Sequence, residues 1–301
     1  MEKKFKFLVS HEDLSNIRLQ FTKRSKTSKT KTYTGNIGRI IRYSNDASRK
    51  DKISLYPTII VSAKRNRIYN DVNKIKKEHY LYPIYEQKEI HNIMLVLDSS
   101  KSISWVIPNI EKLISIITFN VRISKDKLGL IGFHNDTARI YHYPTTNTKL
   151  IIGSINDLDI GGFTPLAEGL KKAINIFSHE RYQIQGVKNI ILLVSDCFPE
   201  PLQGGFKNLF DEPSYKNVLY VSEKIKESKI KLMIIYPREE KDDNELTWGI
   251  KLAKALSEKA NGELIEIHPE MRGNFITGFK YDVNKNDLQS FISKYKQVVE
   301  Y

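Results

Sequence analysis

Short apolar runs that each end in polar residues constrain this chain more than any other feature. Ile93–Leu97 is an uninterrupted apolar run, and Asp98 follows it directly. A second run, Ile190–Val194, leads through a serine to Asp196. Uninterrupted apolar runs of this length are typical of strands that are buried on both faces, as in a parallel sheet covered by helices. The sequence therefore predicts two buried strands, each with an acidic residue just beyond its carboxyl end.

From residue 92 onward, strand-like and helix-like segments alternate, which is the signature of a doubly wound α/β sheet. The polar stretch His134–Thr137 separates two strand-like runs and predicts a hairpin, so that the second run forms an antiparallel edge of a mostly parallel sheet. The complete set of predicted strands is 93–97, 128–133, 138–143, 190–194, 231–235 and 263–267, and helices are predicted from Pro108 to Val121, from Thr164–Pro165 to Phe177, and around 217–229, 244–260 and 284–299.

Positive charge is concentrated in the first part of the chain. Residues 1–91 hold 21 Lys and Arg against 9 Asp and Glu, whereas residues 92–301 hold 27 against 26. Residues 23–32 consist of Lys, Arg, Ser and Thr alone, and this lack of apolar side chains predicts a mobile loop. We therefore expect a basic N-terminal extension, 1–91, followed by an α/β domain, 92–301. The extension suggests an acidic protein or a nucleic acid as its partner, or a solubilising surface with no partner.

The composition excludes several classes of protein. A hydrophobic content of 40% supports a globular core. No run approaches the roughly 18 to 20 apolar residues of a membrane-spanning helix, and the first residues lack the apolar centre of a signal peptide, so we expect a cytoplasmic protein without a membrane partner. The single cysteine, Cys197, excludes a disulfide framework and is expected to be a small buried residue, the alternative being an exposed thiol beside the site. No phosphate-binding G-x-x-x-x-G-K-[S/T] loop and no Ser-His-Asp or Cys-His arrangement is evident, so we expect no catalytic residues.

Oxygen-bearing side chains follow the predicted strand ends. Asp98, Ser100 and Ser102 alternate along one tight turn and can point to the same side, Thr164 lies at a predicted helix start after Gly161–Gly162, and Asp196 follows the second strand. Ligands of open α/β sheets bind at the carboxyl ends of the strands. Carboxylates and hydroxyls without a Cys or His cluster favour Mg²⁺ or Mn²⁺ over Zn²⁺. Each residue alone is also compatible with an ordinary turn or helix cap; together they predict a metal site.

These segments resemble a von Willebrand factor A (VWA) domain, a Rossmann-like α/β fold, with its metal-ion-dependent adhesion site (MIDAS). They are similar in particular to the domain that ends the D-type subunit of magnesium and cobalt chelatases, and Gly38–Arg39 and Pro57–Thr58 resemble the linker before that domain. The resemblance covers roughly residues 35–270 and lacks the AAA+ ATPase domain of those subunits. It implies that Ser100, Ser102 and Thr164 ligate the metal directly or nearly so, that Asp98 and Asp196 ligate it directly or through water, and that an acidic residue of a partner fills the open position.

Two features depart from the chelatase pattern: Lys101 stands where that branch usually has glycine, and the Pro- and Gly-rich loop Cys197–Pro213 replaces a short turn. Three functions remain open. The first is a metal-dependent adaptor that works with a separate AAA+ ATPase of the chelatase or MoxR type. The second is a subunit of a chelatase that inserts Mg, Co or Ni into a tetrapyrrole. The third is a nucleic-acid-binding protein that uses its basic extension.

Overall fold

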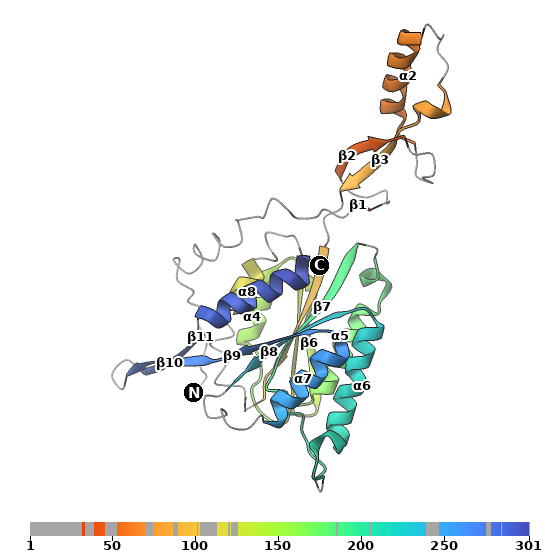
Figure 1. Cartoon of the computed structure of the whole chain (residues 1–301). Helices are drawn as coiled ribbons and strands as arrows, with labels where there is room; N and C mark the ends of the chain where they lie inside the picture. Colours follow the sequence, from red (N-terminus) through yellow and green to blue (C-terminus); the bar gives the residue numbers. More distant parts are fainter. Residues whose placement is uncertain are drawn as a thin grey trace. The chain divides into compact units, whose positions relative to one another are not determined.

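A computed structural model gives the fold of two compact units, one from Ile90 onward and one within residues 24–89 (Figure 1). Of the predicted loop 23–32 the structure describes only Thr32, which belongs to a short strand, Thr32–Tyr33. The rest of that loop, Lys101 and the start of the helix at Pro108 lie outside the described residues. The structure describes residues 32–33, 39–45, 53–69, 75–86, 90–100, 102, 113–119, 121, 126–184, 186–204, 206–238, 247–274, 278–283 and 285–300.

The larger unit is built on a six-stranded sheet with the strand order β6-β5-β4-β7-β8-β9. All neighbouring strands are parallel except β6, which pairs antiparallel with β5 at the edge. The predicted α/β class, the mostly parallel sheet, and the hairpin with its antiparallel edge strand are therefore confirmed. The strands are β4 (Ile90–Asp98), β5 (Lys127–His134), β6 (Thr137–Thr145), β7 (Val187–Val194), β8 (Lys231–Pro237) and β9 (Glu263–Ile267).

Helices cover both faces of this sheet (Figure 1). One apolar core joins the sheet to the helical residues 113–119, to α4 (Thr148–Asn156) and to α8 (Lys285–Glu300). The other core joins it to α5 (Leu166–Phe177), α6 (Pro213–Glu227) and α7 (Trp248–Ala260). The sheet is thus the middle layer of three.

The central strand β4 explains why its sequence is an unbroken apolar run. Side chains of successive strand residues point to opposite faces. Ile93, Leu95 and Leu97 belong to the first core, whereas Met94 and Val96 belong to the second, and none is more than 1% exposed. Within Ile93–Leu97 the strand is buried on both faces and offers no position for a solvated side chain, and Asp98, at the edge of the sheet, is buried as well.

Two elements of the larger unit were not predicted. Helix α4 was missed, and so was the antiparallel hairpin of β10 (Pro269–Asn274) and β11 (Gly278–Val283). Helix α6 begins at Pro213, before the predicted start at 217, because proline is well suited to the first helical position, where its missing N–H leaves no bond unmade. Within the described residues, no helix is both long and apolar enough to cross a membrane.

The smaller unit combines a three-stranded antiparallel sheet with one helix. Its strand order is β1-β3-β2, from β1 (Thr32–Tyr33), β2 (Arg39–Ser44) and β3 (Tyr82–Glu86). Helix α2 (Leu55–Tyr69) is followed by a single 3₁₀ turn, η1 (Lys77–His79). The leucine and isoleucine content of residues 53–60 therefore belongs to a helix.

Candidate metal site

The predicted site lies at the point where the order of the strands reverses. From β4 the chain adds β5 and β6 on one side, and it then crosses to place β7 on the other side of β4. Asp98 ends β4, and Asp196 follows β7, its parallel neighbour. Open α/β sheets bind their ligands at such a switch point, because the loops leaving the two strands diverge there and expose a crevice.

The turn after β4 holds its oxygen atoms close together. The backbone N–H of Ser100 donates to Asp98 Oδ1 at 2.9 Å, and the hydroxyl oxygens of Ser100 and Ser102 are 2.9 Å apart. Adjacent ligands of an octahedral Mg²⁺, each bound at about 2.0 to 2.1 Å, are separated by about 2.9 Å. The two serine hydroxyls form a hydrogen bond with each other, and their separation also equals that of neighbouring ligands on one cation.

Asp98 is fixed by a residue that sequence reasoning missed. The hydroxyl of Ser195 donates to Asp98 Oδ2 at 2.7 Å and accepts from the N–H of Cys197 at 2.9 Å. Both Asp98 and Ser195 are completely buried. Ser195 directly follows the apolar run 190–194, just as Asp98 directly follows the first apolar run. The sequence therefore contained the pattern that would have identified Ser195.

The two carboxyl groups of the site are electrostatically strained. Burial, followed by the negative charge of Asp196, raises the pKa of Asp98 to about 7 from an ordinary 3.8, although the Ser195 hydrogen bond opposes this. Burial also raises the pKa of Asp196, and a hydrogen bond from the Ser102 side chain partly offsets that shift. Two carboxylates brought this close without a counter-ion disfavour each other's charged form. A divalent cation between them would remove this penalty.

Thr164 reaches the site through its loop. The N–H of Gly161 donates to the Ser99 carbonyl at 2.9 Å, and the N–H of Glu200 donates to the Thr164 carbonyl at 3.1 Å, so this loop is tied to both strand ends. Gly162 has φ of +72°, and a Cβ there would collide with the Asn135 side chain. Only glycine adopts this positive φ without strain and also leaves room for the Asn135 side chain. Thr164 is 2% exposed.

The helix-cap interpretation of Thr164 is not supported. Helix α5 begins at Leu166 with Pro165 as its N-cap, and no side chain caps it. The Thr164 hydroxyl is therefore not used at the helix N-terminus. Asp98, in contrast, does accept the N–H of a residue two positions later, as in a local turn. That bond uses one of its oxygens and leaves further lone pairs on both.

The loop Cys197–Pro213 is tied to the Thr164 segment and braced by a bond within itself. Besides the bond from Glu200 to Thr164, the N–H of Gln203 donates to a carboxylate oxygen of Glu212, which is fully buried at the start of α6. Cys197 is also fully buried, as expected, and burial together with the charges of Asp196 and Asp98 raises the pKa of its thiol. Hydrogen bonds thus hold the loop in place beside Asp196.

Helix α7 closes the opposite side of Asp196. A Cβ on Gly249, in the first turn of this helix, would collide with the backbone carbonyl oxygen of Asp196. The glycine permits the helix to approach the strand end more closely than any larger residue would. The sequence places Gly249 inside the helix predicted around 244–260, but it does not show that Asp196 is the neighbour of this glycine.

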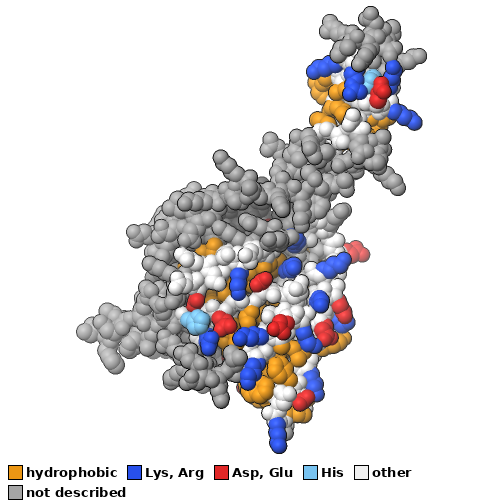
Figure 2. Space-filling view, viewed as in Figure 1, with side chains coloured by type: hydrophobic (Ala, Val, Ile, Leu, Met, Phe, Trp, Pro, Cys, Tyr) orange, Lys and Arg blue, Asp and Glu red, His pale blue; other side chains and the backbone are white. Residues whose placement is uncertain are grey.

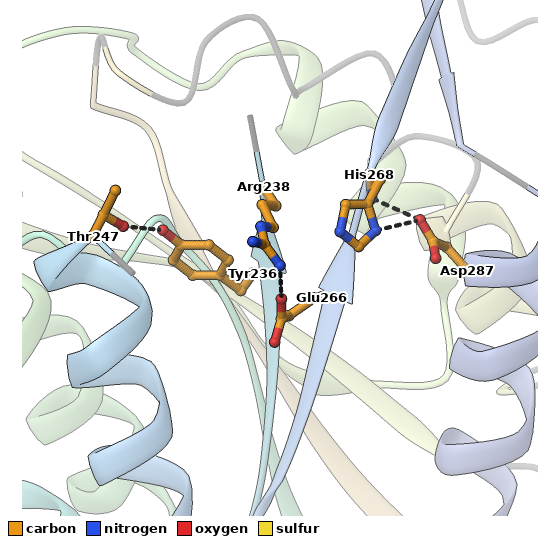
Figure 3. Close-up of polar contacts among 6 residues, drawn as sticks. All are labelled: Tyr236, Arg238, Thr247, Glu266, His268 and Asp287. Atoms are coloured by element: carbon orange, nitrogen blue, oxygen red, sulfur yellow. Dashed lines mark hydrogen bonds and ion pairs between the residues drawn. The ribbon is translucent and has the colours of Figure 1, made fainter. Parts of the chain in front are cut away.

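The remaining polar groups at this end of the sheet pair with one another (Figure 3). Arg238 donates to Glu266 at 3.1 Å, and the Tyr236 hydroxyl lies 3.1 Å from that of Thr247. The backbone N–H of His268 donates to Asp287 Oδ2 at 2.6 Å, and Nδ1 of the same histidine lies 3.2 Å from that oxygen. His134 lies where β5 enters the hairpin, with Nδ1 3.5 Å from the Ser99 hydroxyl.

The donor set fits a hard cation. Among the described residues, no three His, Cys, Asp or Glu side chains gather as a metal-binding group. Any ion at this site therefore depends on two carboxylates supplemented by hydroxyls, which are oxygen ligands suited to Mg²⁺ or Mn²⁺ and poorly suited to Zn²⁺.

Comparison with known proteins gives a family match over the same region. Residues 93–199 match the von Willebrand factor type A domain. An uncharacterized protein of Methanocaldococcus jannaschii is 30% identical over 112 residues, which are 37% of this chain and 60% of that protein. The chain thus spans less than two thirds of that relative.

Three solved structures are similar to parts of this chain at low sequence identity. The VWA domain of SpRpn10 is 16% identical with a TM-score of 0.42, covering 60% of this chain and 89% of that one. BatB from Bacteroides thetaiotaomicron is 15% identical with a TM-score of 0.46, covering 70% and 98%. The vWF domain of the pilus tip protein Mfa5 from Porphyromonas gingivalis is 11% identical with a TM-score of 0.46, covering 60% and 90%.

The match over residues 93–199 begins in β4 and ends just after Asp196, so it includes the strands and loops that form the candidate site. The six-stranded sheet with one antiparallel edge is consistent with the same fold. Over residues 93–199 the chain is therefore similar to the von Willebrand factor type A domain.

Proposed function

We propose that the larger unit is a metal-dependent protein-interaction domain. Its cation is Mg²⁺ or Mn²⁺, and the residues that hold it are Asp98, Ser100, Ser102, Thr164 and Asp196. The cation, when bound, supplies positive charge that offsets the two carboxylates and one coordination position for an oxygen of another protein. An acidic residue of a partner provides that oxygen, as the resemblance to adhesion-type sites implies.

One observation carries this proposal: two buried carboxyl groups with raised pKa values share a site with serine hydroxyls at the spacing of adjacent Mg²⁺ ligands. A purely structural turn gains nothing from burying Asp98 and Asp196, because burial disfavours the charged form of both groups and the charge of Asp196 further disfavours that of Asp98. A divalent cation turns the same arrangement into a favourable one.

The partner we infer is a separate AAA+ ATPase of the chelatase or MoxR type. This inference rests on the resemblance to chelatase D-type subunits and on the lack of a phosphate-binding loop in this sequence. In that arrangement the ATPase supplies the energy, and this chain connects it to a substrate or to a catalytic subunit. A role within a chelatase that inserts Mg, Co or Ni into a tetrapyrrole is the narrower form of the same hypothesis, and it requires a porphyrin-binding subunit in the complex.

A second candidate function is favoured by the charge distribution. Residues 1–91 carry 21 Lys and Arg against 9 Asp and Glu, which suits a polyanion such as nucleic acid. This function predicts an affinity that falls steeply with salt and that is lost when residues 18–52 are deleted. It makes no use of the metal site.

Affinity capture from native lysate separates these functions. The tagged protein is tested in Mg²⁺, in EDTA, and as Asp98→Ala in Mg²⁺, with Asp157→Ala as a control that removes an exposed carboxylate beyond the end of α4. We expect an AAA+ ATPase with the wild type and the control in Mg²⁺ only. Equal recovery under all conditions, or recovery of nucleic acid alone, would refute the metal-dependent adaptor. Circular dichroism of each variant distinguishes a lost partner from a lost fold.

A further inference from the structure

Helix α2 of the smaller unit buries polar residues and exposes its large apolar residues. Its buried residues are Thr58 and Ser62, which are 2% and 3% exposed. Its large aliphatic and aromatic residues point outward: Leu55 is 72% exposed, Tyr56 77%, Ile59 52% and Ile60 38%. A helix that packs against its own domain normally shows the opposite arrangement.

Hydrogen bonds explain why the hydroxyls face inward. Thr58 Oγ1 accepts the N–H of Leu81 at 3.0 Å, and Ser62 Oγ lies 3.0 Å from Nδ1 of the buried His79. These bonds attach the helix to the segment around η1 through side chains that contribute little apolar burial. The orientation of α2 is therefore specified by polar contacts, and its apolar residues are held outward.

The exposed side chains form one continuous stripe. Residues spaced by three or four positions lie above one another on a helix, so Leu55, Ile59 and the exposed Ala63 form one row, and Tyr56 and Ile60 form the row beside it. The small Ala63 leaves room for a close approach at the end of the first row. Two adjacent rows of this kind are the surface onto which a second helix packs.

The surroundings of the stripe are basic. Lys64 follows Ile60 by four positions, and Arg65, Lys76 and Lys77 are also exposed, against the single exposed acid Glu78 among the described residues of this unit. Figure 2 shows apolar atoms on this unit bordered by Lys and Arg side chains. Across residues 24–89 the sequence holds 16 Lys and Arg against 6 Asp and Glu.

We propose that this stripe is a docking site for an acidic amphipathic helix of a partner protein. The aliphatic rows require an apolar ridge on the partner, and the basic border is complementary to Asp and Glu beside that ridge. Nucleic acid satisfies the charges but leaves Leu55 and Ile59 against a polar surface. A membrane-surface helix keeps its polar face in water, whereas the face of α2 opposite the stripe is packed. The site is independent of the metal.

The first experiment identifies what covers α2. The photo-crosslinker p-benzoylphenylalanine replaces Tyr56 in the full chain, and the same replacement at Tyr220, an exposed tyrosine of α6, is the control. Crosslinked peptides are sequenced by mass spectrometry after irradiation in cells. We expect position 56, and not 220, to capture a segment of another protein with an apolar heptad-type stripe flanked by Asp and Glu. Capture of lipid, of nucleic acid, or of this chain alone would overturn the proposal.

The second experiment measures the interaction with the purified full chain. The captured segment is synthesised with a fluorophore and titrated by anisotropy. Ile59→Asp should weaken binding at least ~10-fold, because it places a charge in the apolar contact. Leu150→Asp, at a similarly exposed aliphatic position of α4, should leave it unchanged.

Charge and metal dependence complete the test. Lys64→Glu should weaken binding about 2- to 5-fold at low salt, and the effect should fade at 500 mM NaCl. EDTA should have no effect, which separates this site from the metal site. Equal binding by the wild type and Ile59→Asp, or binding to phosphatidylglycerol vesicles that Ile59→Asp abolishes, would show that the stripe is not a protein-docking site.

Discussion

The substitution Asp98→Asn should stabilise the metal-free protein, although it removes a proposed ligand. The side chain is fully buried, and its pKa is raised from 3.8 to about 7. A carboxyl group whose pKa is raised on folding binds its proton more tightly in the folded state. Its contribution to stability therefore falls as the pH rises from the unfolded to the folded pKa, and the penalty is complete above about pH 7.

The size of the effect follows from the shift. About three pKa units correspond to about 4 kcal/mol at pH 8, and the penalty at pH 5 is on the order of 2 kcal/mol. Asparagine can still accept from the N–H of Ser100, but its amide gives the Ser195 hydroxyl no acceptor in place of Asp98 Oδ2, which costs about 1 kcal/mol. We therefore expect a net gain of about 3 kcal/mol at pH 8 and about 1 kcal/mol at pH 5.

Urea unfolding followed by tryptophan fluorescence measures this difference. Trp105 and Trp248 are the two tryptophans of the chain and both belong to the region from residue 92 onward, so the signal reports the larger unit. In EDTA the variant should unfold at higher urea than the wild type. Saturating Mg²⁺, at about 100 times its Kd, should stabilise the wild type by about 2.7 kcal/mol and leave the variant unchanged. The difference in unfolding free energy between variant and wild type should therefore nearly disappear.

Asp157→Asn, at an exposed position, is the matched control and should change the urea unfolding curve neither in EDTA nor in Mg²⁺. The reasoning is refuted if Asp98→Asn is no more stable than the wild type in EDTA at pH 8, since the two carboxyl groups would then not oppose each other. Equal stabilisation of wild type and variant by Mg²⁺ would mean that the ion binds elsewhere.

Three further substitutions or reactions test the surroundings of the site. Gly162→Ala should lower the unfolding free energy by about 2 to 4 kcal/mol, because residue 162 has φ of +72° and the new methyl group meets Asn135. Gly153 is a helical glycine with open space around it, so Gly153→Ala should instead raise the unfolding free energy by about 0.5 to 1 kcal/mol, as measured by thermal or urea unfolding. Cys197 should not react with Ellman's reagent at pH 8 until the protein unfolds, because burial raises its pKa; rapid reaction in the native state would contradict its burial. Tyr215→Phe should leave stability unchanged or raise it by up to about 1 kcal/mol, because the buried Tyr215 hydroxyl has no hydrogen-bond partner among the residues that the structure describes. A clear loss of stability would reveal an internal water.

The layout of the large unit was predictable because its strands are buried on both faces. A run such as Ile93–Leu97 has no polar position, and that pattern occurs in few structures other than a strand covered by helices. The hairpin at His134–Thr137 was predictable from its polar turn. Helix α4 was missed because its segment is short and partly apolar on several sides, and the β10–β11 hairpin because its strands show no clear alternation.

The candidate site was only partly predictable. Asp98 and Asp196 could be placed at one edge because both follow parallel strands, and the strand order makes those strands neighbours. Ser195 and Gly249 act through contacts with residues distant in sequence, so their roles depend on the packing of β7 and α7. In the smaller unit, no helix was predicted for α2, and the hydrogen bonds of Thr58 and Ser62, which decide which face is inside, join residues distant in sequence.

The alternation of side chains along β4 makes the strand a partition between two separate cores. Leu95 and Val96 are adjacent in sequence, yet they pack with different sets of helices. Substitutions at sites that share no packing partners usually add independently. During evolution, each half of the interior can therefore change its residues without compensating changes in the other half. Positions that covary among relatives should then lie on the same face of the sheet, and residues adjacent along the strand should seldom covary.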